Sequence, residues 1–140
     1  MADFAKQVID RLDRKRAGMY ALLLNHSGRM EGEARVRAPW KDRTGTARRA
    51  IHGGVDVKVP NKVFVLYLAH GVQYGGILEE GSPEHEIRPR NKKALYWPGA
   101  KHPVKKVKHP GTKPYPAVKP TVEKNIPIVR STVREYWRSI

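Results

Sequence analysis

The sequence predicts an α+β fold in which a long N-terminal helix and a C-terminal helix pack on a small antiparallel β-sheet. Apolar residues recur at helical spacing near both ends of the chain, and valines alternate with polar residues between them. This order favours one sheet covered by helices. The length of 140 residues suits one domain, so we expect residues 1–140 to form a single unit.

The first helix is predicted over residues 3–37. Asp3 is a suitable N-cap, and no proline occurs before Pro39. The stripe is most apolar around Met19–Leu24, where we expect the helix to pack. Glycines favour a bend or break near Asn25–Gly28.

A short helix should follow, with Thr44 or Thr46 as its cap, because a hydroxyl can accept a hydrogen bond from the free N–H groups of a first turn. The helix should continue through Ala50. Gly53 and Gly54 are predicted to end it.

The next segment predicts an antiparallel hairpin. Val55, Val57 and Val59 alternate with polar residues, which is typical of a strand with one buried face. Pro60-Asn61 is the predicted turn. The run Val63–Leu68 is more fully apolar and is the best candidate for a central strand.

The second half of the chain is predicted to contain shorter elements. Tyr74–Gly81 forms a short helix or turn closed by Gly81, and Ile87 starts an extended piece. Two short strands are expected at Ala94–Trp97 and Val104–Val107, and the last helix over Thr121–Arg138. Pro127 within this last helix indicates either a kink or the true helix start.

Charge is the strongest functional signal. The net charge is +15, from 28 basic and 13 acidic residues, and self-repulsion at such a charge implies a polyanion or an acidic partner surface. Residues 87–122 contain no acid, and we interpret residues 87–119 as a basic, proline-rich, partner-facing arm. The candidate contacts to a partner or to DNA are Arg88, Arg90, Lys92, Lys93, Lys101, Lys105, Lys106, Lys108 and Lys113.

Aromatic residues are interleaved with these cations, as in surfaces that hold a phosphate backbone and stack on bases. The alternative is a solvated loop whose lysines discourage strand-edge pairing. No recognition helix, ribonucleoprotein-type aromatic pattern or zinc-finger spacing is present.

Other chemistry has weaker support. The absence of cysteine excludes disulfides and thiolate metal sites, and the histidine spacing fits no metal motif, so we predict no metal, cofactor or catalytic residue. A small basic ribonuclease would use His85, His102 or His109, which we place in loops. No apolar run approaches the ~20 residues of a membrane span, and the N-terminus lacks a signal core, so we expect no membrane partner.

The order of motifs carries a resemblance. The segments are Trp40-Lys41-Asp42-Arg43-Thr44-Gly45-Thr46-Ala47-Arg48, Tyr74-Gly75-Gly76-Ile77-Leu78-Glu79-Glu80-Gly81, Ile87-Arg88-Pro89 leading to Lys93-Ala94-Leu95, and His109-Pro110-Gly111. Together they resemble the tail-component family of HK-type siphophages, related to the tail-completion protein of phage lambda. The resemblance spans residues 1–138.

The resemblance implies a structural, non-enzymatic virion protein, assembled in the host cytoplasm. It would form a ring, commonly sixfold, at the head–tail junction, joining the head connector or stopper to the tail tube or terminator. Packaged double-stranded DNA would pass through the lumen. Ring contacts join different patches of neighbouring copies, and the inter-subunit acidic candidates are Glu79, Glu80, Glu84 and Glu86. A sequence-nonspecific nucleic-acid-binding module remains the alternative.

Overall fold

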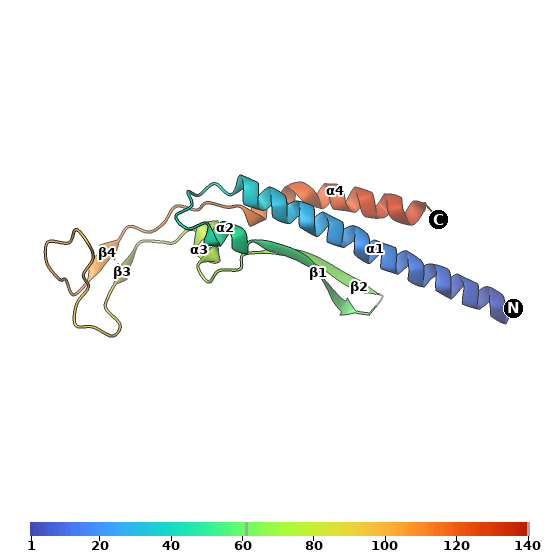
Figure 1. The fold of residues 1–140 in the computed structure, drawn as a ribbon, viewed down its shortest axis with the longest axis horizontal. Helices are drawn as coiled ribbons and strands as arrows, with labels where there is room; N and C mark the ends of the chain where they lie inside the picture. Colours follow the sequence, from blue (N-terminus) through green and yellow to red (C-terminus); the bar gives the residue numbers. More distant parts are fainter. Residues whose placement is uncertain (61, 140) are drawn as a thin grey trace.

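The computed structural model describes residues 1–60 and 62–139 and confirms the predicted α+β class. Helices α1 and α4 lie side by side, and the β1–β2 hairpin runs along α1 (Figure 1). The β3–β4 ribbon projects from the end of the elongated molecule that lies away from the two chain termini. The elements are α1 Ala2–Arg37, α2 Thr46–Ala50, β1 His52–Val59, β2 Val63–Ala69, α3 Gly75–Glu80, β3 His85–Ile87, β4 Val107–His109 and α4 Val118–Arg138.

Helix α1 is continuous over 36 residues, so the predicted break near Asn25–Gly28 is wrong. It begins at Ala2, with Met1 rather than Asp3 at the N-cap position. Its buried residues extend from the predicted Met19–Leu24 segment toward the C-terminal end of the helix, because the hairpin and α4 cover mainly that half. They are Leu23, His26, Ser27, Met30 and Ala34.

The hairpin has the predicted antiparallel pairing, with Gly53 opposite Leu68 and Val57 opposite Phe64. Gly53 and Gly54 do not end α2, which stops at Ala50; both lie in β1. A Cβ atom at Gly53 would come within 2.8 Å of the Ser27 carbonyl oxygen. Glycine therefore lets β1 pass directly under α1.

Burial fades toward the tip of the hairpin. Leu68 is buried, whereas Val57, Val59 and Val63 are 47%, 43% and 43% exposed, so the prediction of a strand with one buried face fails at this end. Within the described residues β1 and β2 form a two-stranded sheet, which makes the central position predicted for Val63–Leu68 wrong. The predicted turn includes Asn61, which lies outside the described residues.

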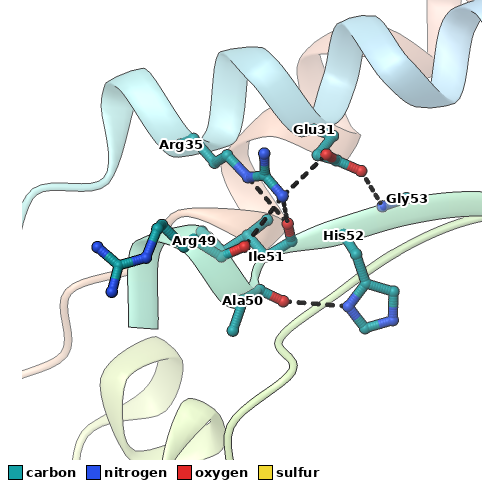
Figure 2. Close-up of polar contacts among 7 residues, drawn as sticks. All are labelled: Glu31, Arg35, Arg49, Ala50, Ile51, His52 and Gly53. Carbon is teal, nitrogen blue, oxygen red and sulfur yellow. Dashed lines mark hydrogen bonds and ion pairs between the residues drawn. The ribbon is translucent and has the colours of Figure 1, made fainter. Parts of the chain in front are cut away.

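Two charged side chains of α1 bind the start of β1 (Figure 2). Arg35 donates to the carbonyl oxygens of Ile51, at 2.8 and 3.0 Å, and of Arg49, at 3.0 Å. Glu31 accepts a 2.9 Å hydrogen bond from the Gly53 N–H and pairs with Arg35 at 2.9 Å. Glu31 thus occupies the outer edge of β1 at Gly53, and Arg35 binds the residues just before the strand.

The hydrophobic core is small and lies where α1, the hairpin and the start of α4 meet. Ile51 is the one large side chain in the described residues that is fully buried. It packs in a cluster with Met30, Ala34, Ala38, Leu68 and Ala117. A core of this size stabilises only the middle of an elongated molecule.

Two separate ribbons replace the single predicted sheet, because β3 pairs only with β4 among the described residues. The predicted strand Ala94–Trp97 is reduced to one bridge between Leu95 and Val104, and the predicted strand Val104–Val107 is replaced by β4 further along the chain. Prolines in this segment lack a backbone N–H donor, and glycines weaken strand formation, so regular pairing is interrupted.

Helix α4 begins at Val118, before the predicted Thr121, and Pro127 lies inside it rather than at its start. Its far end is fixed to α1 by two polar contacts. The Tyr136 hydroxyl donates to the Lys15 carbonyl at 2.6 Å, and the Trp137 indole N–H lies 2.8 Å from the Met19 sulfur. Beyond these contacts the first turns of α1 are exposed.

Candidate interaction arm

The candidate site is the segment between α3 and α4, residues 82–116, called the arm from here on. It contains the β3–β4 ribbon, with the Ser82–Thr112 and Leu95–Val104 bridges on either side of it. The arm projects away from the helices (Figure 1). None of its residues is buried, so it gains little from apolar burial.

Glu79 fixes the base of the arm. Its carboxylate accepts hydrogen bonds from the backbone N–H groups of Ala117, Val118 and Lys119, at 3.0, 3.2 and 2.6 Å. It also lies 2.8 Å from His70 Nε2. One carboxylate at the end of α3 therefore caps the N-terminus of α4 and holds both ends of the arm together.

The environment of Glu79 sets its ionisation. Burial alone would raise the pKa of this carboxyl, but hydrogen bonds from His70 and from the backbone N–H groups outweigh burial and lower the pKa below its ordinary value. The sequence predicts that Glu79 meets a lysine of a neighbouring subunit. Because its carboxylate is engaged within its own chain, we remove it from the inter-subunit candidates.

Two of the remaining candidate acids form ion pairs along the ribbon. Glu84 lies 2.7 Å from Lys108, and Glu86 lies 2.5 Å from Arg88 and 3.8 Å from Lys106. Arg88 and, to a lesser extent, Lys106 hold the pKa of Glu86 below its ordinary value. These contacts neutralise part of the positive charge near the base of the arm.

The rest of the arm remains strongly cationic. Nine basic residues against two glutamates give the arm a net charge of +7. Among the described residues, six of these cations have no acidic partner within ion-pair distance: Arg90, Lys92, Lys93, Lys101, Lys105 and Lys113. The structure thus separates the predicted contact residues into three that are paired within the arm and six that are free.

Two aromatic side chains are exposed in the loop between β3 and β4. Tyr96 is 68% exposed and Trp97 is 45% exposed. Large apolar side chains beside free cations suit contact with a macromolecular surface, since they combine area for burial with charge for orientation. The loop therefore has the chemistry of a docking element.

The histidines predicted to lie in loops are partly in regular structure. His85 and His109 are cross-strand partners in the ribbon, with ring centroids 4.9 Å apart. His85 Nδ1 lies 2.9 Å from the Pro83 carbonyl, and His109 Nδ1 accepts from the Gly111 N–H at 3.1 Å. These backbone contacts orient both rings.

Sequence reasoning missed the role of the His70–Glu79 pair. The two residues are nine positions apart, and Glu79 meets helix α4 only through the fold. The one signal in the sequence is Gly81, which is predicted to end the short helix and does so with φ of 75°. That turn directs the chain out of α3 into the arm.

Comparison with family models, with curated proteins and with solved structures finds no significant match. Within residues 1–60 and 62–139 no helix is long and apolar enough to cross a membrane. In the same residues, no three histidine, aspartate or glutamate side chains lie close enough together to hold a metal ion.

Proposed function

We propose that this protein is a structural, non-enzymatic subunit of a tailed-phage virion. Copies of it form a ring, most simply a hexamer, at the head–tail junction and link the head connector or stopper to the tail tube or terminator. The order of motifs that resembles the tail-component family supports the place of assembly. The exposed surface supports the oligomer.

That surface is the observation that carries the proposal. The chain exposes 10830 Å². A compact monomer of 15.9 kDa exposes about 7,350 Å², which leaves an excess of about 3,500 Å². A standard interface takes about 800 Å² from each partner, and obligate interfaces take more. The excess is therefore enough for two large interfaces per copy, the number that each member of a ring makes.

The excess surface is partly apolar and lies toward the end of the molecule away from the arm (Figure 1). Phe4, Val8, Ile9 and Leu12 are exposed at the start of α1, and valines are exposed at the tip of the hairpin. Exposed apolar surface on this scale is typical of protein–protein contacts. In the assembled ring, neighbouring copies and adjoining virion proteins would cover it.

The free cations of the arm define the kind of surface that they meet. Acidic patches of connector or tail proteins, or the phosphates of packaged DNA in the lumen, have the complementary charge. Lysine predominates among these cations and binds phosphate as a point charge without reading bases. Such contacts would let DNA slide.

The test is the mass of the purified protein by light scattering, together with negative-stain images. We expect rings or ring-sized oligomers, alone or on addition of a connector or tail-tube protein. A protein that stays at 15.9 kDa with and without these partners would contradict the proposal.

The cationic arm favours one alternative, a sequence-nonspecific nucleic-acid-binding module that acts as a monomer. The six free cations of the arm, together with the exposed Tyr96 and Trp97, support it. This alternative predicts binding of short duplexes of unrelated sequence with a steep dependence on salt. Duplex binding by a protein that forms no oligomer would favour this module over the ring.

A further inference from the structure

The outer edge of β2 is open. Because the Gly53 N–H binds Glu31 outside the hairpin, the register turns the N–H and C=O groups of Phe64, Leu66 and Leu68 away from β1 as well. In the described residues, no hydrogen bond outside the hairpin involves these three. Strand β2 also lacks charged residues and proline, the usual protection of an exposed edge.

This edge borders an apolar trough between β2 and α4. Two adjoining cavities of about 210 and 810 Å³ share Leu68 and Val122 as lining residues. Leu66 and Ile126 line the smaller one, and Ile126 is 42% exposed. An apolar channel beside unpaired backbone groups suits an extended segment, which can add main-chain hydrogen bonds and bury its side chains.

The larger cavity is acidic. Glu80 and Glu123 line it, and among the described residues neither has a cationic partner within ion-pair distance. Glu79 also lines it but is engaged with α4, and Lys119 is the one lysine or arginine in the lining. Arg130 lines the smaller cavity, so the acidic part of the trough is the larger cavity. This part favours an extended segment that carries positive charge and exposed apolar side chains.

The arm has these properties. It is extended, has a net charge of +7 and exposes Ile87, Tyr96 and Trp97. In its own copy it points away from the helices (Figure 1). We propose that the arm of a second copy docks in the trough bounded by β2, α3 and the first turns of α4. This inference rests on the proposed ring.

The geometry of this contact extends naturally to a ring. Each copy has one arm and one trough on different parts of its surface, so the contact is heterologous. Such a contact leaves a free arm at one end of any open chain of subunits and a free trough at the other. When the chain of subunits closes into a ring, the last free arm fills the last free trough. Glu80 and Glu123 would then replace Glu79 as the acids that meet a neighbour's lysines.

A charge-reversal pair tests the contact. Glu80→Lys with Glu123→Lys places two cations in the trough, and we expect roughly tenfold weaker self-association in sedimentation velocity, because like charges across an interface are strongly unfavourable. As the matched control for Glu123→Lys alone, Glu135→Lys makes the same change in net charge at an exposed acid of α4 outside the trough. We expect the control to associate like the original protein.

A cross-linking measurement locates the contact directly. The chain has no cysteine, so Glu123→Cys provides a single site for a maleimide-linked photoreactive group. Mixed with isotope-labelled unmodified copies, this variant should yield cross-links between its modified α4 peptide and labelled arm peptides from residues 82–116. Cross-links confined to other segments of the labelled copies would overturn the inference.

The outcomes separate the two proposals. Rings that persist after the trough reversal, without arm cross-links, overturn the trough contact and leave the ring intact. Absence of any oligomer contradicts the ring and the trough together. An arm that binds duplex DNA but gives no cross-link in assembled rings is a DNA contact, and that result also overturns the inference.

Discussion

The arm and the rest of the chain, called the body here, use charged side chains in opposite ways. In the body, Arg35 and Arg48 donate to backbone carbonyl oxygens and connect α1 to the segment before β1. In the arm, six cations have no acidic partner among the described residues. The net charge of +15 therefore includes cations that hold the fold together and cations that remain available for partners.

The body and the arm also differ in how far their side chains are buried. The body has a small core around Ile51, whereas no residue of the arm is buried. Free energy of folding comes mainly from apolar burial, so the body should determine the stability of the monomer. The arm contributes surface, and its role depends on what that surface meets.

The largest effect on stability is expected from the core. Ile51→Ala removes the fully buried side chain and should lower the free energy of unfolding by about 2–5 kcal/mol. The matched change in the arm, Ile87→Ala, should alter it by less than about 0.5 kcal/mol. Urea denaturation of both variants measures the difference. Equal losses would mean that the arm is part of the cooperative core.

The next effect should come from a structural cation. Arg48 donates to the carbonyl oxygens of Arg35, Ala38 and Trp40 and pairs with Asp42 at 2.7 Å. Loss of these charge-assisted bonds in Arg48→Ala should cost about 2–3 kcal/mol.

The control for Arg48 is Arg90→Ala in the arm, which should leave the unfolding midpoint unchanged. Thermal denaturation compares the two variants. A stable Arg48→Ala protein would show that the charges of the body are as dispensable for folding as those of the arm.

Glu79 lies at the boundary between the two regions. Its pKa is lowered in the folded state, so the ionised carboxylate stabilises the fold at pH values above its unfolded pKa. That contribution is lost as the pH falls through the folded pKa. Glu79→Gln should cost about 1–3 kcal/mol at neutral pH, because the helix N-terminus and His70 lose a charged partner.

The pH dependence of the stability loss in Glu79→Gln shows whether the carboxylate is its cause. The difference in stability between the original protein and Glu79→Gln should shrink on acidification below the ordinary carboxyl range. Glu80→Gln, at an exposed position without a partner in the described chain, provides the control. A difference that stays constant from neutral to acidic pH would exclude the carboxylate as its source.

The smallest effect on stability is expected in the arm itself. Lys101→Ala with Lys105→Ala should change the unfolding free energy by less than about 0.5 kcal/mol. If the arm meets DNA, the double variant should bind a short duplex more weakly, and the slope of log affinity against log salt should fall by about 1 per lost phosphate contact. Fluorescence anisotropy over a salt series measures this slope.

Local patterns predict local elements well. The 3.6-residue spacing indicates α1, the turn at Gly81 indicates the end of α3, and alternation indicates the hairpin. Each of these signals lies within one segment of sequence. Period and turn chemistry are sufficient to recognise them.

Predictions that depend on distant segments fail or are missing. Alternation at Val57 and Val59 indicates a buried face, but both side chains are more than 40% exposed, because burial depends on how far other elements cover the hairpin. The cap supplied by Glu79 to α4 joins residues 40 positions apart, so no local motif announces it. Pro127 indicates either a kink or a helix start in the sequence, and only the fold shows that it lies inside α4, which begins at Val118.

The most direct test of the account is the thermal midpoint of the intact protein as a function of its concentration. If copies complete a thin core by covering the exposed apolar surface, association stabilises the folded state, and the midpoint should rise with concentration. A single cooperative transition whose midpoint is independent of concentration, in a protein that remains monomeric throughout, would contradict the account.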